Sequence, residues 1–282
     1  MENFDFLTFD DVSFVYPAVE GDIDSDGNQI EPSPVFEHFS ANLPRGFVSL
    51  VGQNGCGKST LLLLASGRIE PTAGSVSLLG QRLFGMDENQ KNLLATVIYQ
   101  NMEFESEDLV ENLLSFVYEN GKFGAKSNAI LKDGDLLDEV LDVFELENLK
   151  NHSLTHLSKG EIQRVLLAFS ILYGSDSIFM DEPMFAMEER QKEIALDYIQ
   201  KMVHKTGRTV YIAMHELDLT RKFADYVLLI RTDRSMILGS ADEVLTDDEL
   251  EKAYGIPASM LKKKEDLTRE QLKNESDFLS KN

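Results

Sequence analysis

The sequence lacks the features of a secreted or membrane-spanning chain. It contains a single cysteine among 282 residues, which excludes an internal disulfide bond and favours the cytosol. No apolar run approaches the roughly 20 residues that span a bilayer. The longest run, residues 165–173, contains a serine and is typical of a core helix. The N-terminal residues lack the basic and apolar regions of a signal peptide. We therefore expect a cytoplasmic protein that would reach a membrane only through a partner.

Basic residues are also scarce. The chain has 27 lysines and arginines against 49 acidic residues, which gives a formal net charge of −22. Nucleic-acid binders usually carry a basic patch or stripe. The short run Lys262–Lys264 is followed at once by Glu265 and Asp266, as on a solvated helix face. We expect no nucleic-acid partner. The hydrophobic content of 43% is enough for the core of one large domain with a subdomain.

What the chain does contain is a glycine-rich phosphate-binding loop. Residues 52–60 fit the pattern G-x-x-x-x-G-K-[ST] at every fixed position, between an apolar strand candidate at 47–51 and a helix candidate at 61–65. The glycines let backbone N–H groups close around phosphate oxygens at the positive end of the helix dipole. Lys58 would reach the β- and γ-phosphates, and the Ser59 hydroxyl would ligate Mg²⁺. A chance glycine turn is the alternative, which the flanking strand and helix disfavour. The predicted nucleotide-binding residues are Gly52, Asn54, Gly55, Cys56, Gly57, Lys58, Ser59 and Thr60.

The order of apolar segments predicts an α/β fold. Residues 6–16 are expected to form a strand with Phe14 and Tyr16 on one face. Helical spacing over residues 102–157 indicates an inserted helical subdomain. After residue 158, helices and strands alternate, which is typical of a largely parallel sheet.

We therefore predict a P-loop NTPase core with a mostly parallel sheet, an antiparallel β portion near the N-terminus and an inserted helical subdomain. Residues 1–258 would form this domain, with the helical subdomain at about 102–164 and an acidic insertion at 18–34. Residues 259–282 would form a charged C-terminal tail.

A second chemical element follows a buried strand at residues 178–180. Asp181 and Glu182 come directly after this apolar segment. The carboxyl ends of parallel strands face the ligand crevice. Asp181 would therefore serve Mg²⁺, and Glu182 would polarise the attacking water. An acidic pair after a strand can also be a plain turn, but the phosphate loop favours the functional interpretation.

A third element, Leu157-Ser158-Lys159-Gly160-Glu161, lies between these two. Locally, Ser158 and Glu161 match a capping box that opens a helix, and this accounts for both residues. With the phosphate loop before it and Asp181-Glu182 after it, however, the segment resembles the L-S-G-G-Q signature of the ATP-binding cassette (ABC) family. The resemblance covers roughly residues 6–256.

Other positions match the family in the same order. Gln100 stands where the family has its glutamine loop, His215 where it has its switch histidine, and Tyr16 where an aromatic ring stacks on adenine. The resemblance implies that Glu182, His215 and Gln100 are catalytic and that ATP is the nucleotide. It also implies that Ser59, Gln100 and Asp181 hold Mg²⁺. Two copies, or a paired ATPase subunit, would enclose ATP, with Ser158, Gly160 and Glu161 of one chain acting on the nucleotide of the other.

The resemblance also implies the biological role. We expect the ATPase subunit of an ABC importer, with permease subunits on separate chains and a position on the cytoplasmic face of the cell membrane. Residues 239–256 are similar to the tails of importers for iron chelates, cobalamin or other metal-linked cargo. The alternative is a soluble ABC ATPase without transport, such as an Fe–S assembly component. A DNA-repair ATPase is disfavoured by the acidic charge and the lack of a long coiled coil.

Some positions depart from the family pattern. Lys159 and Glu161 replace glycine and glutamine in the signature. Residues 184–188 replace the family's usual T-S-A-L-D with a more hydrophobic loop that ends in Glu188. We expect these changes to affect the rate of ATP turnover rather than ATP binding.

Three further features carry expectations of their own. Cys56 lies beside Lys58 and a helix N-terminus, which predicts a thiolate whose alkylation would block nucleotide binding. Asp22–Gly27 resembles half of a Ca²⁺ loop but lacks the closing glutamate, so an acidic hairpin tip is favoured. His152 and His156 could share a helix face, but without a third ligand they favour a packing or surface role over a metal site.

Overall fold

The structure, a computed structural model, describes residues 6–18, 31–100, 102, 107–122, 135–257 and 259–261. The predicted acidic insertion at 18–34, including Asp22–Gly27, lies largely outside the described residues. So does the predicted tail at 259–282.

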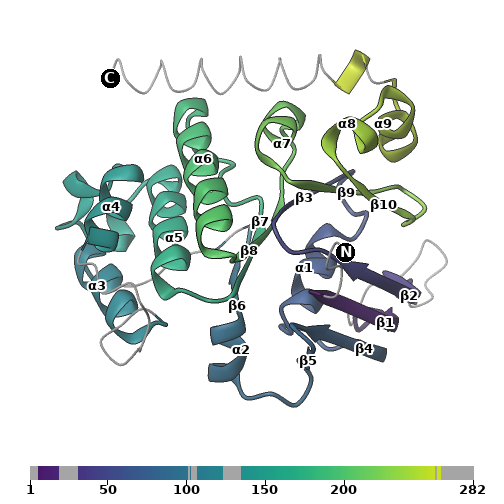
Figure 1. The fold of residues 1–282 in the computed structure, drawn as a ribbon, viewed down its shortest axis with the longest axis horizontal. Coiled ribbons are helices and arrows are strands. Elements are labelled where there is room, and N and C mark those ends of the chain that lie inside the picture. Colours follow the sequence, from purple (N-terminus) through teal and green to yellow (C-terminus); the bar gives the residue numbers. More distant parts are fainter. Residues whose placement is uncertain are drawn as a thin grey trace.

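A six-stranded sheet forms the centre of the molecule, in the order β10-β9-β3-β8-β7-β6 (Figure 1). All neighbouring strands are parallel except the edge pair β9 and β10. Strands β3 and β8 are buried along their whole length, as expected when helices cover both faces of a parallel sheet. The predicted α/β fold is confirmed. The strands are β3 (Phe47–Gly52), β6 (Ala95–Ile98), β7 (Ser177–Asp181), β8 (Thr209–Ala213), β9 (Tyr226–Ile230) and β10 (Met236–Gly239).

A smaller antiparallel sheet has the order β2-β1-β4-β5. Its strands are β1 (Leu7–Phe14), β2 (Phe36–Leu43), β4 (Ala73–Leu78) and β5 (Gln81–Arg82). The prediction that the first strand extends to Tyr16 is wrong, because β1 ends at Phe14, but the Phe14 and Tyr16 rings are in contact, in agreement with the prediction that they lie on one face. The pairing register shifts on both sides of Val12, and Asp11 has a φ of 51°, so the strand bulges before it ends.

Helix α1 (Lys58–Ala65) lies between the two sheets and anchors the phosphate loop. Leu61, Leu62 and Leu64 on this helix are buried in one core with Phe9 of the small sheet and Phe179 of the large sheet. The helix is therefore apolar on several sides. This explains the unbroken leucine run after the loop.

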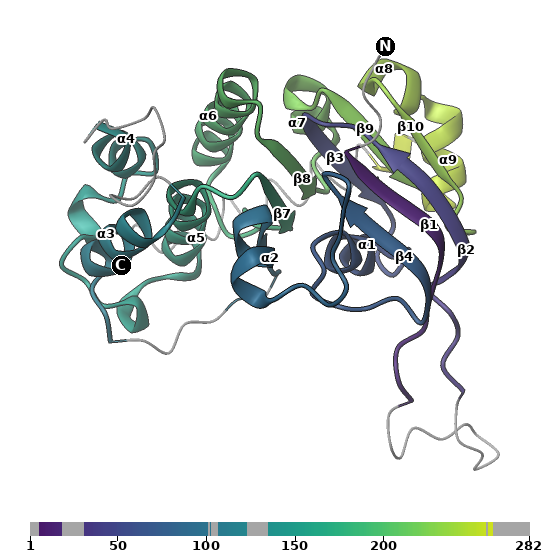
Figure 2. The same cartoon turned by 60° about the horizontal axis from the view of Figure 1, so that its bottom comes forward.

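The helical part lies on the side of the large sheet away from the small one (Figures 1 and 2). Its elements are α3 (Val110–Asn120), α4 (Asp135–Val143), two 3₁₀ turns, η1 (Glu147–Leu149) and η2 (Leu154–His156), and α5 (Lys159–Tyr173). The predicted boundary at 164 falls within α5, which is continuous. This helix packs on α3 and also on β6, so it joins the helical part to the sheet.

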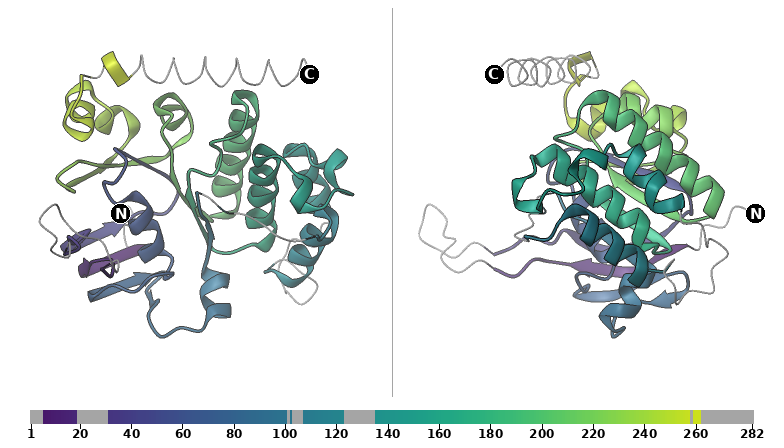
Figure 3. Two further views of the ribbon diagram at one scale, coloured as in Figure 1. Left: turned by 180° about the vertical axis from the view of Figure 1, so that it is seen from behind. Right: turned by 90° about the vertical axis from the view of Figure 1, so that its left-hand side faces the viewer.

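The remaining helices flank the sheet or close its ends, as the views in Figure 3 show. They are α2 (Glu88–Leu94), α6 (Glu189–Thr206), α7 (Leu217–Phe223), α8 (Ala241–Val244) and α9 (Asp247–Tyr254). Leu217, Leu250 and Leu261 share a small core with Val51 of β3, so the C-terminal helices pack near the phosphate loop. Within the described ranges, no helix has the length and hydrophobicity needed to cross a bilayer.

Candidate active site

The phosphate loop joins the end of β3 to the start of α1. Lys58 is buried, and its Nζ donates to the carbonyl oxygens of Gly52 at 2.7 Å and Gln53 at 3.2 Å. Gly52 has a φ of 155°, and a Cβ there would lie 2.5 Å from the carbonyl oxygen of Ile230 in β9. Gly57 has a φ of 109°, and a Cβ there would lie 3.2 Å from the Phe36 ring. The backbone conformation and the close neighbours therefore require glycine at both positions.

Gln100, Glu182 and His215 meet at the carboxyl ends of three neighbouring strands. His215 Nε2 lies 2.6 Å from Glu182 Oε1, and Gln100 Nε2 donates to Glu182 Oε2 at 2.8 Å. Glu182 has a φ of 48°, a conformation costly for a residue other than glycine, and its backbone N–H donates to the Ala213 carbonyl. The structure therefore brings together the three residues predicted to be catalytic, with the glutamate held from both sides.

The pKa values of the adjacent Asp181 and Glu182 carboxyl groups are shifted in opposite directions. The hydrogen bond from His215 lowers the pKa of Glu182, and Lys58 and Gln100 act in the same direction against a burial effect that raises it. Burial raises the pKa of Asp181, and the nearby Glu182 charge adds to this, while Ser59 and Lys58 oppose it. Glu182 is thus held ionised and able to accept a proton or a hydrogen bond from water.

The oxygen atoms near the loop are of the kind that Mg²⁺ prefers. Ser59 is hydrogen-bonded to Asp181, which places a hydroxyl and a carboxylate together beside the loop, and the amide oxygen of Gln100 belongs to the same group of strand ends. Mg²⁺ usually binds through one or two carboxylates plus phosphate oxygens and water. These residues fit that pattern.

No cluster of three or more His, Cys, Asp or Glu side chains suited to a metal occurs in the described part of the chain. The two histidines considered above do not share a helix face. His152 lies in a turn, and His156 ends η2 with its Nδ1 2.6 Å from Ser153 Oγ.

Tyr16 lies next to the first turn of α1. Its hydroxyl is 3.1 Å from Thr60 Oγ1, its ring stands edge-on to Phe14 at 4.9 Å between centroids, and 42% of the residue is exposed. The side chain is therefore accessible beside the nucleotide loop. Adenine stacking on this ring stays a prediction.

The signature segment forms the N-terminus of α5. Ser158 caps the helix, and Glu161 Oε2 accepts from the Ser158 backbone N–H at 2.8 Å and from its hydroxyl at 2.7 Å. Gly160 lies against the loop after Glu182, because a Cβ there would be 2.6 Å from the Ala186 carbonyl oxygen. Glu161 is thus engaged within its own helix, and the signature segment is fixed to the loop at 184–188.

The prediction of a Cys56 thiolate is wrong. Cys56 is 5% exposed, and burial raises the pKa of its thiol despite the neighbouring Lys58 and the backbone hydrogen bonds. Loss of solvation outweighs the nearby positive charge because the sulfur lies under the loop, where a Cβ on Gly52 would come within 2.8 Å of it.

A cleft of about 700 Å³ opens in front of Gln100, Glu182 and His215. Its walls come from the phosphate loop, the strand ends, the loop after Glu182 and the C-terminal helices. The lining includes Gln53, Asn54, Gln100, Glu182, Met184, Phe185, Lys192, His215, Glu216, Leu217, Tyr254, Ile256 and Leu261. The predicted in-trans residues Ser158, Gly160 and Glu161 do not line it.

Sequence reasoning missed an ion pair in this cleft. Lys192 Nζ lies 2.5 Å from Glu216 Oε1, immediately after His215, and Lys192 is only 4% exposed. A signal was present in the sequence. Lys192 shares helical spacing with Ala195, Leu196 and Ile199, which are buried, so a lysine stands on the apolar face of α6.

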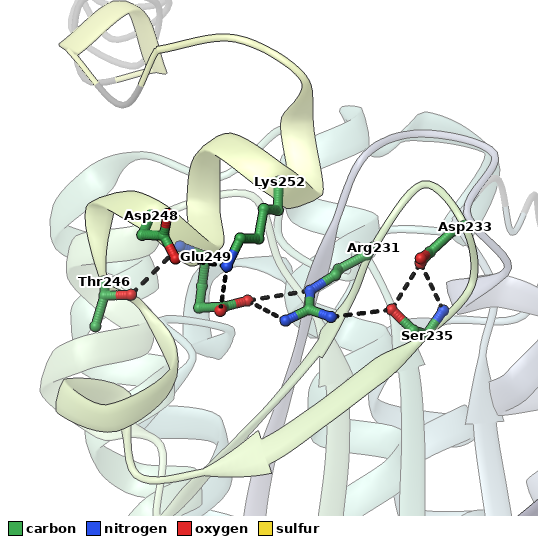
Figure 4. A network of polar contacts seen from close by, with 7 residues as sticks. All are labelled: Arg231, Asp233, Ser235, Thr246, Asp248, Glu249 and Lys252. Atoms are coloured by element: carbon green, nitrogen blue, oxygen red, sulfur yellow. Dashed lines mark hydrogen bonds and ion pairs between the residues drawn. The ribbon is translucent and has the colours of Figure 1, made fainter.

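A polar network joins the segment between β9 and β10 to α9 (Figure 4). Arg231 follows Ile230, which pairs with Gly52 in the parallel sheet. The Arg231 guanidinium binds Glu249 of α9 and the Ser235 hydroxyl. Hydrogen bonds from Arg231 and Lys252 lower the pKa of Glu249. The hairpin after β9 is thereby tied to the C-terminal helices.

Comparison with known proteins agrees with this geometry. The sequence profile of the "ABC transporter" family matches residues 36–185. The chain is 25% identical over 222 residues to the petrobactin import ATP-binding protein YclP of Bacillus subtilis strain 168, covering 78% of this chain and 86% of that one. It is 26% identical over 255 residues to the iron(3+)-hydroxamate import ATP-binding protein FhuC of the same strain, covering 87% and 93%.

A solved structure described as the ATP-binding subunit of an ABC transporter superposes with a TM-score of 0.69 at 21% identity. The match covers 92% of this chain and 98% of that one. This similarity shows that the two chains have the same fold.

Proposed function

The chain belongs to the ABC transporter family, and from this premise we propose that it is the ATP-hydrolysing subunit of a membrane importer. ATP binding and ATPase activity follow from the family and its relatives. We propose further that the chain binds permease subunits on separate chains and acts at the cytoplasmic face of the cell membrane.

The observation that carries the proposal is the arrangement around Glu182. An ionised glutamate, held by His215 at 2.6 Å and Gln100 at 2.8 Å, stands at the strand ends next to the buried Lys58 of the phosphate loop. In phosphoryl transfer, positioning and charge neutralisation do most of the work. A fixed carboxylate near the γ-phosphate position is suited to orienting the attacking water.

Each residue then has a part in hydrolysis. The loop N–H groups and Lys58 would bind the phosphates, Glu182 would accept a hydrogen bond from the water, and His215 and Gln100 would keep its carboxylate in place. Ser59, Asp181 and Gln100 would hold Mg²⁺. When bound, that ion would neutralise part of the triphosphate charge.

Closure of a dimer on ATP would complete the site. Ser158, Gly160 and Glu161 lie outside the cleft that holds the catalytic glutamate. If these residues serve ATP, they serve it in a second copy or in a paired ATPase subunit. A single chain should then be a poor ATPase.

The class of cargo is suggested by the relatives. YclP and FhuC are named for the import of petrobactin and of iron(3+)-hydroxamates, and their similarity extends over most of this chain. We propose an iron chelate or a similar metal-linked compound as cargo.

Affinity purification from detergent-solubilised membranes tests the transport role. We expect a polytopic membrane protein to co-purify in fixed stoichiometry and to stimulate ATP hydrolysis. Recovery of a purely soluble complex would instead favour a non-transport ABC ATPase, such as an Fe–S assembly component.

A further inference from the structure

The loop after Glu182 presents an aromatic side chain to solvent at the mouth of the cleft. Phe185 is 60% exposed, whereas Met184 and Met187 on either side are 4% and 5% exposed. The two methionines fix the loop to the core, and Phe185 lines the catalytic cleft.

That loop is fixed to the signature segment. The backbone N–H of Ala186 donates to Gln163 Oε1 at 2.8 Å, and Gly160 approaches Ala186 so closely that a Cβ would lie 2.6 Å from its carbonyl oxygen. Both contacts join Ala186, the residue after Phe185, to the first turns of α5. Wherever the signature segment docks, Phe185 must therefore go with it.

The cleft has an apolar end beyond the phosphate loop. Gln53 and Asn54 line one part of it, and Leu217, Tyr254, Ile256 and Leu261 line the part formed by α7 and the C-terminal helices. Ile256 is 37% exposed, and Leu261 is buried in the core it shares with Leu217. The nearby Lys192 and Glu216 neutralise each other, so an apolar group would meet no unpaired charge from this pair.

We propose that Phe185 of one copy packs into the apolar end of the other copy's cleft, against Tyr254, Ile256 and Leu261, when ATP closes the dimer. The proposal rests on the proposed function, in which the signature segment of one copy faces the phosphate loop of the other. Phe185, Tyr254, Ile256 and Leu261 line the same cleft, so a two-fold symmetric interface over this cleft can include both partners of the contact. Two identical contacts would form in each dimer.

A disulfide test addresses the contact directly. The double variant Phe185→Cys/Ile256→Cys is made in a Glu182→Gln background, which should hold ATP in a closed dimer. With ATP and a mild oxidant, we expect a covalent dimer on a non-reducing gel, and much less with ADP. The matched control is Phe116→Cys/Ile256→Cys, because Phe116 is 64% exposed but lies on α3, away from the cleft lining. The Glu182→Gln parent, with Cys56 alone, gives the background.

Dimer affinity provides a second measurement. Phe185→Ala in the Glu182→Gln background should raise the ATP-dependent dimer dissociation constant about 100-fold or more, because the variant loses both of the aromatic contacts that form in each dimer. Phe116→Ala should leave it unchanged. Both are measured by analytical ultracentrifugation.

The outcomes separate the two proposals. An ATP-dependent dimer that neither crosslinks through residues 185 and 256 nor weakens in Phe185→Ala overturns this inference and leaves the proposed function standing. The absence of any ATP-dependent dimer in the Glu182→Gln parent overturns dimer closure itself, and this inference with it.

Discussion

Lys192 and Glu216 form an ion pair that joins α6 to the start of α7, one residue after His215. Lys192 Nζ lies 2.5 Å from Glu216 Oε1, and the side chain of Lys192 is 5% exposed and that of Glu216 is 27% exposed. Burial would raise the pKa of Glu216, but Lys192 overrides this effect and the pKa is lowered. The pair thus holds the histidine segment against the helix that follows the loop of Phe185.

Replacement of Lys192 by methionine should destabilise the protein by about 2 kcal/mol at pH 7, because it leaves a half-buried carboxylate without its partner. Urea unfolding followed by circular dichroism measures the loss. The pKa of Glu216 is lower in the folded protein than its value near 4.5 in the unfolded chain. The ion pair therefore stabilises the fold above pH 4.5, and this stabilisation is lost as the pH falls through the folded-state pKa. The difference between Lys192→Met and the parent should therefore shrink at acid pH. An equal deficit at pH 7 and pH 4 would contradict this account.

Glu182→Gln should keep ATP binding and reduce hydrolysis about 100-fold or more, since the glutamine cannot accept the proton that the ionised carboxylate can. Fluorescent nucleotide binding and phosphate release are measured on the same preparation. Glu188→Gln is the control for loss of one nearby acid. Steady-state hydrolysis at the parent rate in Glu182→Gln would remove Glu182 from the mechanism.

Gly160→Ala should destabilise the protein by about 1–3 kcal/mol, because the added methyl would lie 2.6 Å from the Ala186 carbonyl oxygen and force the helix or the loop to shift. The adjacent Lys159→Ala places the same side chain on an exposed position of the same helix and serves as the matched control. Thermal unfolding compares the two. Equal stability would show that the signature helix and the loop at 184–188 are less tightly joined than the structure indicates.

Cys56 should react slowly with a maleimide at pH 7. Its pKa is raised by burial, so a smaller fraction of the thiol is ionised than in an exposed cysteine, and the rate should increase as pH rises. In Phe116→Cys, mass spectrometry can follow the new exposed site and Cys56 in one molecule. Faster labelling at Cys56 than at residue 116 would instead support the sequence-based prediction that the Cys56 thiol is ionised.

Asp181→Asn should raise the melting temperature of the ligand-free protein while weakening Mg–ATP binding. The pKa of Asp181 is raised by burial, so its ionisation costs stability as pH rises through the folded value, and a neutral side chain avoids this cost. Asp142→Asn, at an exposed position on α4, is the control and should leave both properties unchanged. A lower melting temperature for Asp181→Asn would mean that the carboxylate contributes more through Ser59 and Lys58 than burial costs it.

The sequence by itself determined the features that depend on local order. The phosphate loop is recognisable because strand, glycines, lysine and helix follow one another within a few residues. The Ser158–Glu161 capping box is local for the same reason, and the structure contains it. Asp181 and Glu182 were placed at a strand end by the apolar run that precedes them.

Tertiary structure decided the features that depend on segments far apart in the chain. The bulge at Asp11 depends on how the first strand pairs with its neighbours, which alternation alone does not encode. The raised pKa of Cys56 follows from the groups that bury it, which outweigh the nearby lysine. Lys192 and Glu216 are 24 residues apart, and the partner of a lysine on an apolar helix face becomes known only when the helices pack. The cleft that joins the phosphate loop to Ile256 exists only in the folded chain, because distant side chains become neighbours through packing.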